Sequence, residues 1–139
     1  MASVKVTDRI EASADAVWGL LRDFGGIRKF SPGVESCTVV GEGIGAVRTI
    51  VLPGGLELQE RLEAFDDAGR TFQYAIIGET PLPFTDYLST IRLSEDGDAT
   101  AIEWSSTFEP RGDAGDQAGQ IIEGIYTGGI AGLKSALAG

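Results

Sequence analysis

The C-terminal stretch Asp113–Ala138 constrains the fold most, because its apolar residues recur at the spacing of one long amphipathic helix. At about 1.5 Å per residue, such a helix would be roughly 39 Å long, enough to cross a small domain. It is interrupted by glycines, each of which costs about 1 kcal/mol relative to alanine: Gly119, Gly124, Gly128, Gly129 and Gly132. Since Gly129 lies on the apolar face, we expect part of that face to be vacant and the helix to cover a hollow.

The chain before this helix has mainly the patterns of strands. A first strand is predicted at Ser3–Ile10, followed by a helix capped by Ser13 and a short helical piece within Ile27–Gly33. Six further strands are predicted at Glu35–Val40, Ala46–Leu52, Leu56–Phe65, Thr71–Ile77, Asp86–Leu93 and Thr100–Phe108. Short, turn-rich breaks between them favour antiparallel pairing.

The expected fold is therefore α+β. A seven-stranded, curved antiparallel sheet would wrap around the long C-terminal helix, with two short helices after the first strand. The chain has 139 residues, a length typical of one domain, and it shows no repeat or linker. We accordingly expect residues 1–139 to form a single domain.

Composition and charge exclude several classes of partner. The net charge of −10 argues against nucleic acid and anionic membranes, because both carry negative charge. No stretch approaches the roughly 20 apolar residues of a membrane span, so no membrane insertion is expected. Cys37 is the only cysteine, which rules out an internal disulfide. A cytoplasmic location follows by default.

The chain contains no histidine, which removes whole groups of reactions. It can hold neither a Ser-His or Cys-His nucleophile pair nor a histidine-ligated zinc ion. The run Gly41-x-Gly43-x-Gly45 is a weak match to a phosphate-binding loop, since no helix is predicted after it. We therefore predict no metal site and no cofactor.

A buried charge pair is predicted at the centre of the sheet. Strict alternation places Leu56, Leu58, Glu60, Leu62 and Ala64 on one face of the fourth strand. A three-residue Pro53–Gly55 loop would then set Ile50 opposite Leu58 and Arg48 opposite Glu60. The pair could simply fix the register of the strands. Alternatively, it could be a polar handle that orients a ligand in an apolar pocket. If Arg48 turned away, Glu60 would become a candidate acid or base.

The later strands add aromatic and hydroxyl groups to the same inner face. Phe72, Tyr74 and Ile76 form one row, and Tyr87, Ser89, Ile91 and Leu93 form the next. An Asp96-Gly97 turn would set Ile91 opposite Ile102 and Ser89 opposite Trp104. Ile102, Trp104, Ser106 and Phe108 would then face inward, although a one-residue change in this loop would reverse the assignment.

Two loops could border the mouth of such a cavity. The Pro53–Gly55 loop is flexible by composition, whereas Pro81–Phe84 is stiff and exposes apolar side chains. At a cavity rim these side chains would act as a gate. An interface for a homodimer is the competing interpretation, and the sequence leaves open whether the protein is a monomer or a weak homodimer.

Several motifs in order along the chain resemble the START-like helix-grip superfamily, often labelled SRPBCC. The closest likeness is to bacterial members of the polyketide cyclase/dehydrase and lipid-transport family. The motifs that carry it are Ile10–Trp18, Phe30–Cys37, Glu60–Leu62, Tyr87–Ser89 and Phe108–Pro110, and the likeness covers essentially the whole chain. It implies a seven-stranded sheet that grips the C-terminal helix around a hydrophobic cavity.

The resemblance also implies roles for particular residues. Members of the superfamily bind lipids, sterols, polyketides or hormones, and a minority catalyse cyclisation or dehydration. Glu60, Tyr87 and Ser89 match positions that contact ligand, directly or through water, in the related plant abscisic-acid receptors. Those receptors carry a lysine where this chain has Ser31, so their carboxylate anchor is missing here. This departure argues against hormone binding.

Three functions remain open from the sequence. The first is a carrier or sensor for a small, mostly hydrophobic molecule that is lipid- or polyketide-like. The second is a cyclase- or dehydratase-type enzyme that uses Glu60 as its acid or base. The third is a structural or partner-binding domain whose cavity is packed shut. The predicted ligand-binding residues are Arg48, Ile50, Leu58, Glu60, Leu62, Tyr74, Ile76, Leu82, Tyr87, Ser89, Trp104, Ile122, Tyr126 and Gly129.

Overall fold

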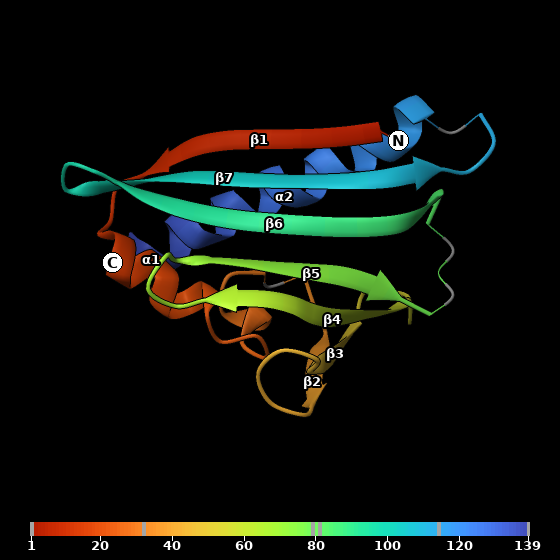
Figure 1. Ribbon diagram of the computed structural model, residues 1–139, viewed down its shortest axis with the longest axis horizontal. Coiled ribbons are helices and arrows are strands. Elements are labelled where there is room, and N and C mark those ends of the chain that lie inside the picture. Colours follow the sequence, from red (N-terminus) through yellow and green to blue (C-terminus); the bar gives the residue numbers. More distant parts are fainter. Residues whose placement is uncertain (1, 32, 79, 81, 114, 139) are drawn as a thin grey trace.

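The computed structural model describes residues 2–31, 33–78, 80, 82–113 and 115–138. In this described part of the chain, seven strands and two helices follow one another, with one turn of 3₁₀ helix, η1, after the first helix (Figure 1). The elements are β1 Ala2–Ile10, α1 Ala14–Leu21, η1 Ile27–Lys29, β2 Ser36–Val40, β3 Val47–Val51, β4 Glu57–Asp66, β5 Thr71–Ile77, β6 Phe84–Asp96, β7 Ala99–Pro110 and α2 Gly115–Leu137.

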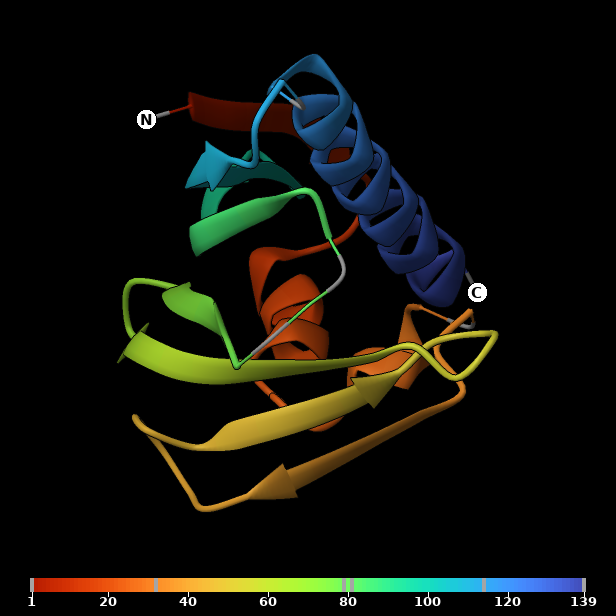
Figure 2. The same cartoon turned by 90° about the vertical axis from the view of Figure 1, so that its right-hand side faces the viewer.

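All seven strands form one antiparallel sheet in the order β1-β7-β6-β5-β4-β3-β2. The sheet bends so that α1 lies between its two halves, while α2 runs across the open side and packs against β1 (Figure 2). The sequence-based prediction of an α+β sheet wrapped around a long C-terminal helix is confirmed. Of the two predicted short helices, the second is only the single turn η1.

Local chemistry explains where α1 begins and what it buries. The Ser13 side chain accepts a hydrogen bond from the Ala16 amide at 3.2 Å, which caps the helix as predicted. Val17, Trp18 and Leu21 follow at helical spacing and are buried in the core. The helix ends at Leu21.

The register between β3 and β4 agrees with the prediction. Arg48 lies opposite Glu60 and Ile50 lies opposite Leu58. The amide of Leu52 donates to the carbonyl of Leu56 at 2.8 Å, which closes the three-residue loop between the strands. The loop length therefore determines that the two charged side chains share the inner face.

The predicted register between β6 and β7 is wrong. Ile91 lies opposite Trp104, and Ser89 lies opposite Ser106. The two-residue loop is Gly97-Asp98, and Gly97 has a φ of +62°, a value that suits glycine at the first position of a tight hairpin. Because the pairing moves by two residues, the side chains keep their faces, and Trp104 is buried on the inner side as expected.

An irregularity in β4 overturns one prediction about the inner face. The pairing with β5 shifts between Leu62 and Ala64, so Ala64 lies opposite Gln73 and Phe65 lies opposite Phe72. The bulge inserts one residue and reverses the alternation beyond it. Ala64 therefore leaves the apolar row, and Phe65 packs its ring 5.5 Å from that of Trp18.

The helix α2 buries one stripe of side chains against the sheet, and its glycines differ in what they face. The predicted vacancy at Gly129 is wrong, because a β-carbon there would lie 2.7 Å from Trp104 Cζ3. The open space lies at Gly124 and Gly128, where a β-carbon would meet no described atom within 4 Å. At Gly132, a β-carbon would overlap the carbonyl of Phe30, so the loop after η1 rests directly on the helix backbone.

Candidate functional site

A pocket of about 480 Å³ lies between α2, the loop after η1 and the inner face of the sheet. We call it the central pocket. Its wall is mainly apolar and includes the side chains Leu21, Ile27, Phe30, Val34, Ile50, Leu52, Leu58, Phe72, Ile76, Leu82, Phe84, Ile91 and Ile125. Its volume falls within the range of about 300–1,000 Å³ that is usual for sites of small molecules.

Most of the predicted ligand-binding residues border this pocket. They are Arg48, Ile50, Leu58, Glu60, Tyr74, Ile76, Leu82, Tyr87, Trp104 and Gly129. Four do not border it: Leu62, Ser89, Ile122 and Tyr126, all of which are buried in the packed core. Two of these four residues, Ser89 and Tyr126, contact the indole of Trp104, and Trp104 itself borders the pocket.

Several wall residues were not among the predicted set. Phe30 and Val34 belong to the loop after η1, where no strand or helix periodicity indicates which way a side chain points. Gly124, Ile125 and Gly128 border the pocket from α2. The two glycines could have been predicted as wall residues. Glycine destabilises a helix interior, so its presence there indicates that space beside the helix is needed.

The only charged groups in the wall of the pocket, among the described residues, are Arg48 and Glu60. Their side chains are 6% and 9% exposed, and Arg48 Nε donates to Glu60 Oε1 at 2.8 Å. Arg48 Nη2 lies 2.7 Å from the same oxygen, while Nη1 donates to the carbonyl of Phe24 at 3.0 Å. The guanidinium carbon is also 4.1 Å from the centre of the Phe24 ring. Arg48 is thus turned toward Glu60 and is held there by the carboxylate of Glu60 and by the carbonyl and the ring of Phe24.

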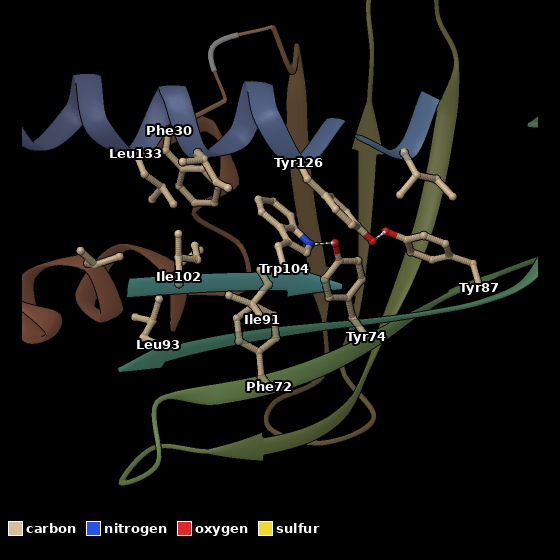
Figure 3. Packing of buried hydrophobic residues seen from close by; sticks show 14 of the residues in the cluster. Phe30, Phe72, Tyr74, Tyr87, Ile91, Leu93, Ile102, Trp104, Tyr126 and Leu133 are labelled. Atoms are coloured by element: carbon tan, nitrogen blue, oxygen red, sulfur yellow. Dashed lines mark hydrogen bonds between the residues drawn. The ribbon is translucent and has the colours of Figure 1, made fainter. Parts of the chain in front are cut away.

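Hydrogen bonds join the three tyrosines to Trp104, in part through Ser89. Figure 3 shows two of these bonds, Tyr87 to Tyr126 and Trp104 to Tyr74. The hydroxyls of Tyr87 and Tyr126 are 2.5 Å apart, and that of Tyr126 is 3.1 Å from Ser89 Oγ. Trp104 Nε1 donates to Ser89 Oγ at 3.0 Å and to Tyr74 Oη at 3.2 Å. These polar atoms therefore satisfy one another in a buried network.

Burial raises the pKa of all three phenols, those of Tyr74, Tyr87 and Tyr126, because the apolar surroundings disfavour a phenolate. The three groups are consequently neutral at physiological pH. They can donate or accept a hydrogen bond, but they cannot supply a negative charge to a bound molecule.

The two predicted gate loops differ in their relation to the pocket. Pro53, at the start of the β3–β4 loop, and Leu82, before β6, both border it. Phe84 was expected to be exposed at the rim, but this is wrong, because it is the first residue of β6 and only 1% exposed. Pro81 lies outside the described residues. Whether either loop opens and closes stays a prediction.

Within the described part of the chain, no cluster of three or more acidic or cysteine side chains is arranged to hold a metal ion. None of the described helices is both long and apolar enough to cross a membrane.

The family model described as polyketide cyclase / dehydrase and lipid transport matches residues 1–138. The chain belongs to this family. The match covers almost the whole sequence and agrees with the helix-grip fold seen in the structure.

Solved structures and a curated relative support this membership. An uncharacterised protein from Bacillus thuringiensis superposes with a TM-score of 0.90 at 32% identity, over 99% of this chain and 100% of the other. The protein XoxI from Bacillus cereus gives 0.90 at 33% identity, over 99% and 96% of the two chains. The abscisic acid receptor PYL2 of Arabidopsis thaliana is 35% identical over 78 residues. That match takes in 52% of this chain and only 41% of the receptor.

Proposed function

We propose that this member of the polyketide cyclase / dehydrase and lipid transport family holds one small, mostly apolar molecule in the central pocket, as a carrier or a sensor. The observation that carries the proposal is the pocket itself, with its volume of about 480 Å³ and its largely apolar wall beside a glycine-containing stretch of α2. Burial of an apolar molecule there is favourable by roughly 25 cal/mol per Å² of surface removed from water.

The Arg48–Glu60 pair gives this pocket one polar end. In our proposal, the polar group of the ligand lies next to the pair, and the apolar body lies against Ile50, Leu58 and Ile76. A few placed polar groups in an apolar wall are typical of sites that orient a small molecule. Because the pair carries no net charge, we expect a neutral polar group such as a hydroxyl or a ketone.

The relatives support binding in general. PYL2 is by its name a receptor for abscisic acid, a small molecule, and it is similar to about half of this chain. The sequence departs from such receptors at Ser31, and the pocket has no other cation than Arg48 among the described residues that border it. We therefore do not propose that this protein binds abscisic acid.

Catalysis by Glu60 is less well supported than binding. Two nitrogen atoms of Arg48 lie within 2.8 Å of Glu60 Oε1, so this oxygen is already engaged. A carboxylate held in this way orients a ligand more readily than it transfers a proton. The alternative of a cavity packed shut disagrees with the pocket found here.

Mass spectrometry of the intact protein under native conditions tests the proposal. We expect a fraction of the purified protein to carry one additional mass of a few hundred daltons, which solvent extraction releases as an apolar compound. The Gly128→Leu variant should lose this mass, because its side chain would enter the open space beside the pocket. Gly19→Leu is the matched control, since Gly19 also has open space around it but lies on α1 away from the pocket.

Two outcomes would overturn the proposal. One is a protein that carries no extra mass and binds none of a panel of neutral apolar compounds at millimolar concentration. The other is an extra mass retained equally by the Gly128→Leu and Gly19→Leu variants, because the bound compound would then lie elsewhere.

A further inference from the structure

A second pocket, of about 470 Å³, lies at the end of the sheet where β5 and β6 separate. The two strands pair only as far as Ala75 and Leu88, although β5 continues to Ile77 and β6 begins at Phe84. The ribbons of the two strands diverge toward this end (Figures 1 and 2). Alternation places Ala75, Ile77 and Leu88 on the face of the sheet opposite to the central pocket, so we call this second pocket the outer cleft.

A bulge in β6 lies at the point of separation. The pairing of β6 with β7 shifts between Thr85 and Leu88, and Asp86 lies within this shift with a φ of +54°. A bulge bends the strand that carries it, so β6 turns away from β5 here. Ile77 remains paired with Gln59 of β4, and Thr85 remains paired with β7. Both sides of the opening are therefore held in the sheet, and the outer cleft is part of the fold.

The charge of the outer cleft is opposite to that of the protein. Among the described residues that border it, the charged ones are Arg61, Arg111 and Asp86, in a chain with a net charge of −10. Arg61 belongs to β4 and Arg111 directly follows β7, so the two cations come from opposite sides of the opening. Asp86 offsets only one of them. A local excess of positive charge in an acidic protein attracts anions to this place.

Arg111 is held in position and still has unused donors. Its amide donates to the carbonyl of Pro83 at 2.9 Å, and its Nη1 donates to the carbonyl of Thr80 at 3.0 Å. Its Nε and Nη2 make no hydrogen bond or ion pair with any described residue. These two nitrogens form one edge of the guanidinium, and such an edge can bind both oxygens of a carboxylate or phosphate at once.

Arg61 adds a donor from the other side of the outer cleft. Its Nε and Nη2 lie 2.8 and 2.7 Å from the same oxygen of Glu63, which leaves Nη1 without a partner in the described part of the chain. The same wall includes the apolar side chains of Ala75, Ile77 and Leu88, and Leu88 is 36% exposed. Free guanidinium donors beside an apolar surface suit a molecule that has one anionic group and an apolar part.

We propose that the outer cleft is a second binding site, separate from the central pocket, and that it takes a small amphiphilic anion. The carboxylate or phosphate of this ligand binds the free edge of Arg111 and Nη1 of Arg61. The apolar part of the ligand covers Ile77 and Leu88. The site is independent of the occupant of the central pocket, which is expected to be a neutral molecule.

A titration followed by ¹⁵N–¹H NMR at low ionic strength tests this site. The probes are hexanoate, hexyl phosphate and 1-hexanol, which share one alkyl chain and differ in the head group. Hexanoate and hexyl phosphate should each shift the backbone amide signals of Ala75, Ile77 and Leu88 in a saturable way, whereas 1-hexanol should not. The affinity for both anions should fall as NaCl is added, because salt screens exposed charges.

Three variants assign the effect to the outer cleft. Arg111→Gln and Arg61→Gln should each weaken the binding of hexanoate about two- to fivefold, as is usual for an exposed ion pair. Arg92→Gln is the matched control, because it removes the same charge from β6 but does not border the cleft. Gly128→Leu, which fills space beside the central pocket, should leave the affinity of the outer cleft for hexanoate unchanged.

Three outcomes would overturn the outer cleft as an anion site. The first is an Arg92→Gln variant that binds hexanoate as weakly as Arg111→Gln does, because net charge alone would then explain the loss. The second is equal shifts from 1-hexanol and hexanoate, or no saturable shift from either anion. The third is a set of shifts confined to Ile50 and Leu58, which border the central pocket. In each case the proposed function of the central pocket stands.

Discussion

Arg48 and Glu60 form a charge pair enclosed by the pocket wall, and each residue depends on the other. Both side chains are less than one-tenth exposed, so either charge alone would be poorly solvated. The carbonyl of Phe24 accepts a further hydrogen bond from Arg48. This carbonyl is neutral, so without Glu60 the guanidinium would lose its counter-charge. The attraction between the two side chains therefore mainly offsets their own desolvation.

Glu60→Gln should lower the free energy of unfolding by about 3–5 kcal/mol, because it leaves a buried guanidinium without its counter-charge. The double variant Arg48→Met/Glu60→Leu removes both charges and should recover most of that loss. Urea unfolding followed by circular dichroism measures both. A single variant as stable as the unaltered protein would show that the pair is solvated, contrary to the burial seen here.

The helix α2 uses its glycines in two opposite ways. Gly128 borders the pocket and has open space where a β-carbon would be, whereas Gly132 has the Phe30 carbonyl there. Neither has a positive φ, so conformational freedom is not the reason for either glycine. Phe30 also borders the pocket, and its contact with the helix at Gly132 therefore holds one wall in place.

The matched variants Gly128→Ala and Gly132→Ala should have opposite effects on stability. Alanine at 128 should raise the free energy of unfolding by up to about 1 kcal/mol, the usual gain for glycine to alanine within a helix. Alanine at 132 should lower it despite the same gain, since the methyl group would push the backbone of the Phe30 loop away from the helix.

Thermal unfolding of the two variants measures the difference. If Gly132→Ala gains stability as Gly128→Ala does, then the loop after η1 does not rest on the helix in solution. The wall that Phe30 gives to the pocket would then be absent as well.

At the scale of the whole molecule, all three tyrosines of the chain are buried in one network. Their burial makes the free energy of unfolding fall at high pH. Burial raises the pKa of each phenol in the folded state above the ordinary value of about 10. The unfolded chain therefore releases these protons first as the pH rises. Their contribution is fully present below pH 10 and is lost as the pH increases beyond that value.

We expect the free energy of unfolding to fall steeply above about pH 10, by up to about 1.4 kcal/mol per pH unit for each phenol. Urea unfolding at pH 8, 9, 10 and 11 measures this slope, and tyrosinate absorbance at 295 nm reports ionisation. The Tyr87→Phe variant should show a shallower slope. Tyrosinate that forms near pH 10 while the fold persists would contradict the burial of these rings.

The sequence predicted those parts of the molecule that depend on local periodicity. The Arg48–Glu60 pairing followed from one loop length and from alternation, and it is correct. The bulge after Leu62 could not be predicted, because one extra residue leaves no mark on the pattern of apolar residues. The contact between Trp104 and Gly129 was also beyond sequence reasoning, since it joins a strand and a helix whose distance only the complete fold defines.

The strand order has a consequence for how the molecule is made. The edge strand β1 precedes the other strands along the chain, yet among the described strands it pairs with β7 alone, and Ile10 lies opposite Thr100. Closure of such a long loop is entropically costly and slow. On a ribosome, β1 therefore has no neighbouring strand until β7 has emerged, and α2 can cover the inner face of the sheet only after all these strands have been made.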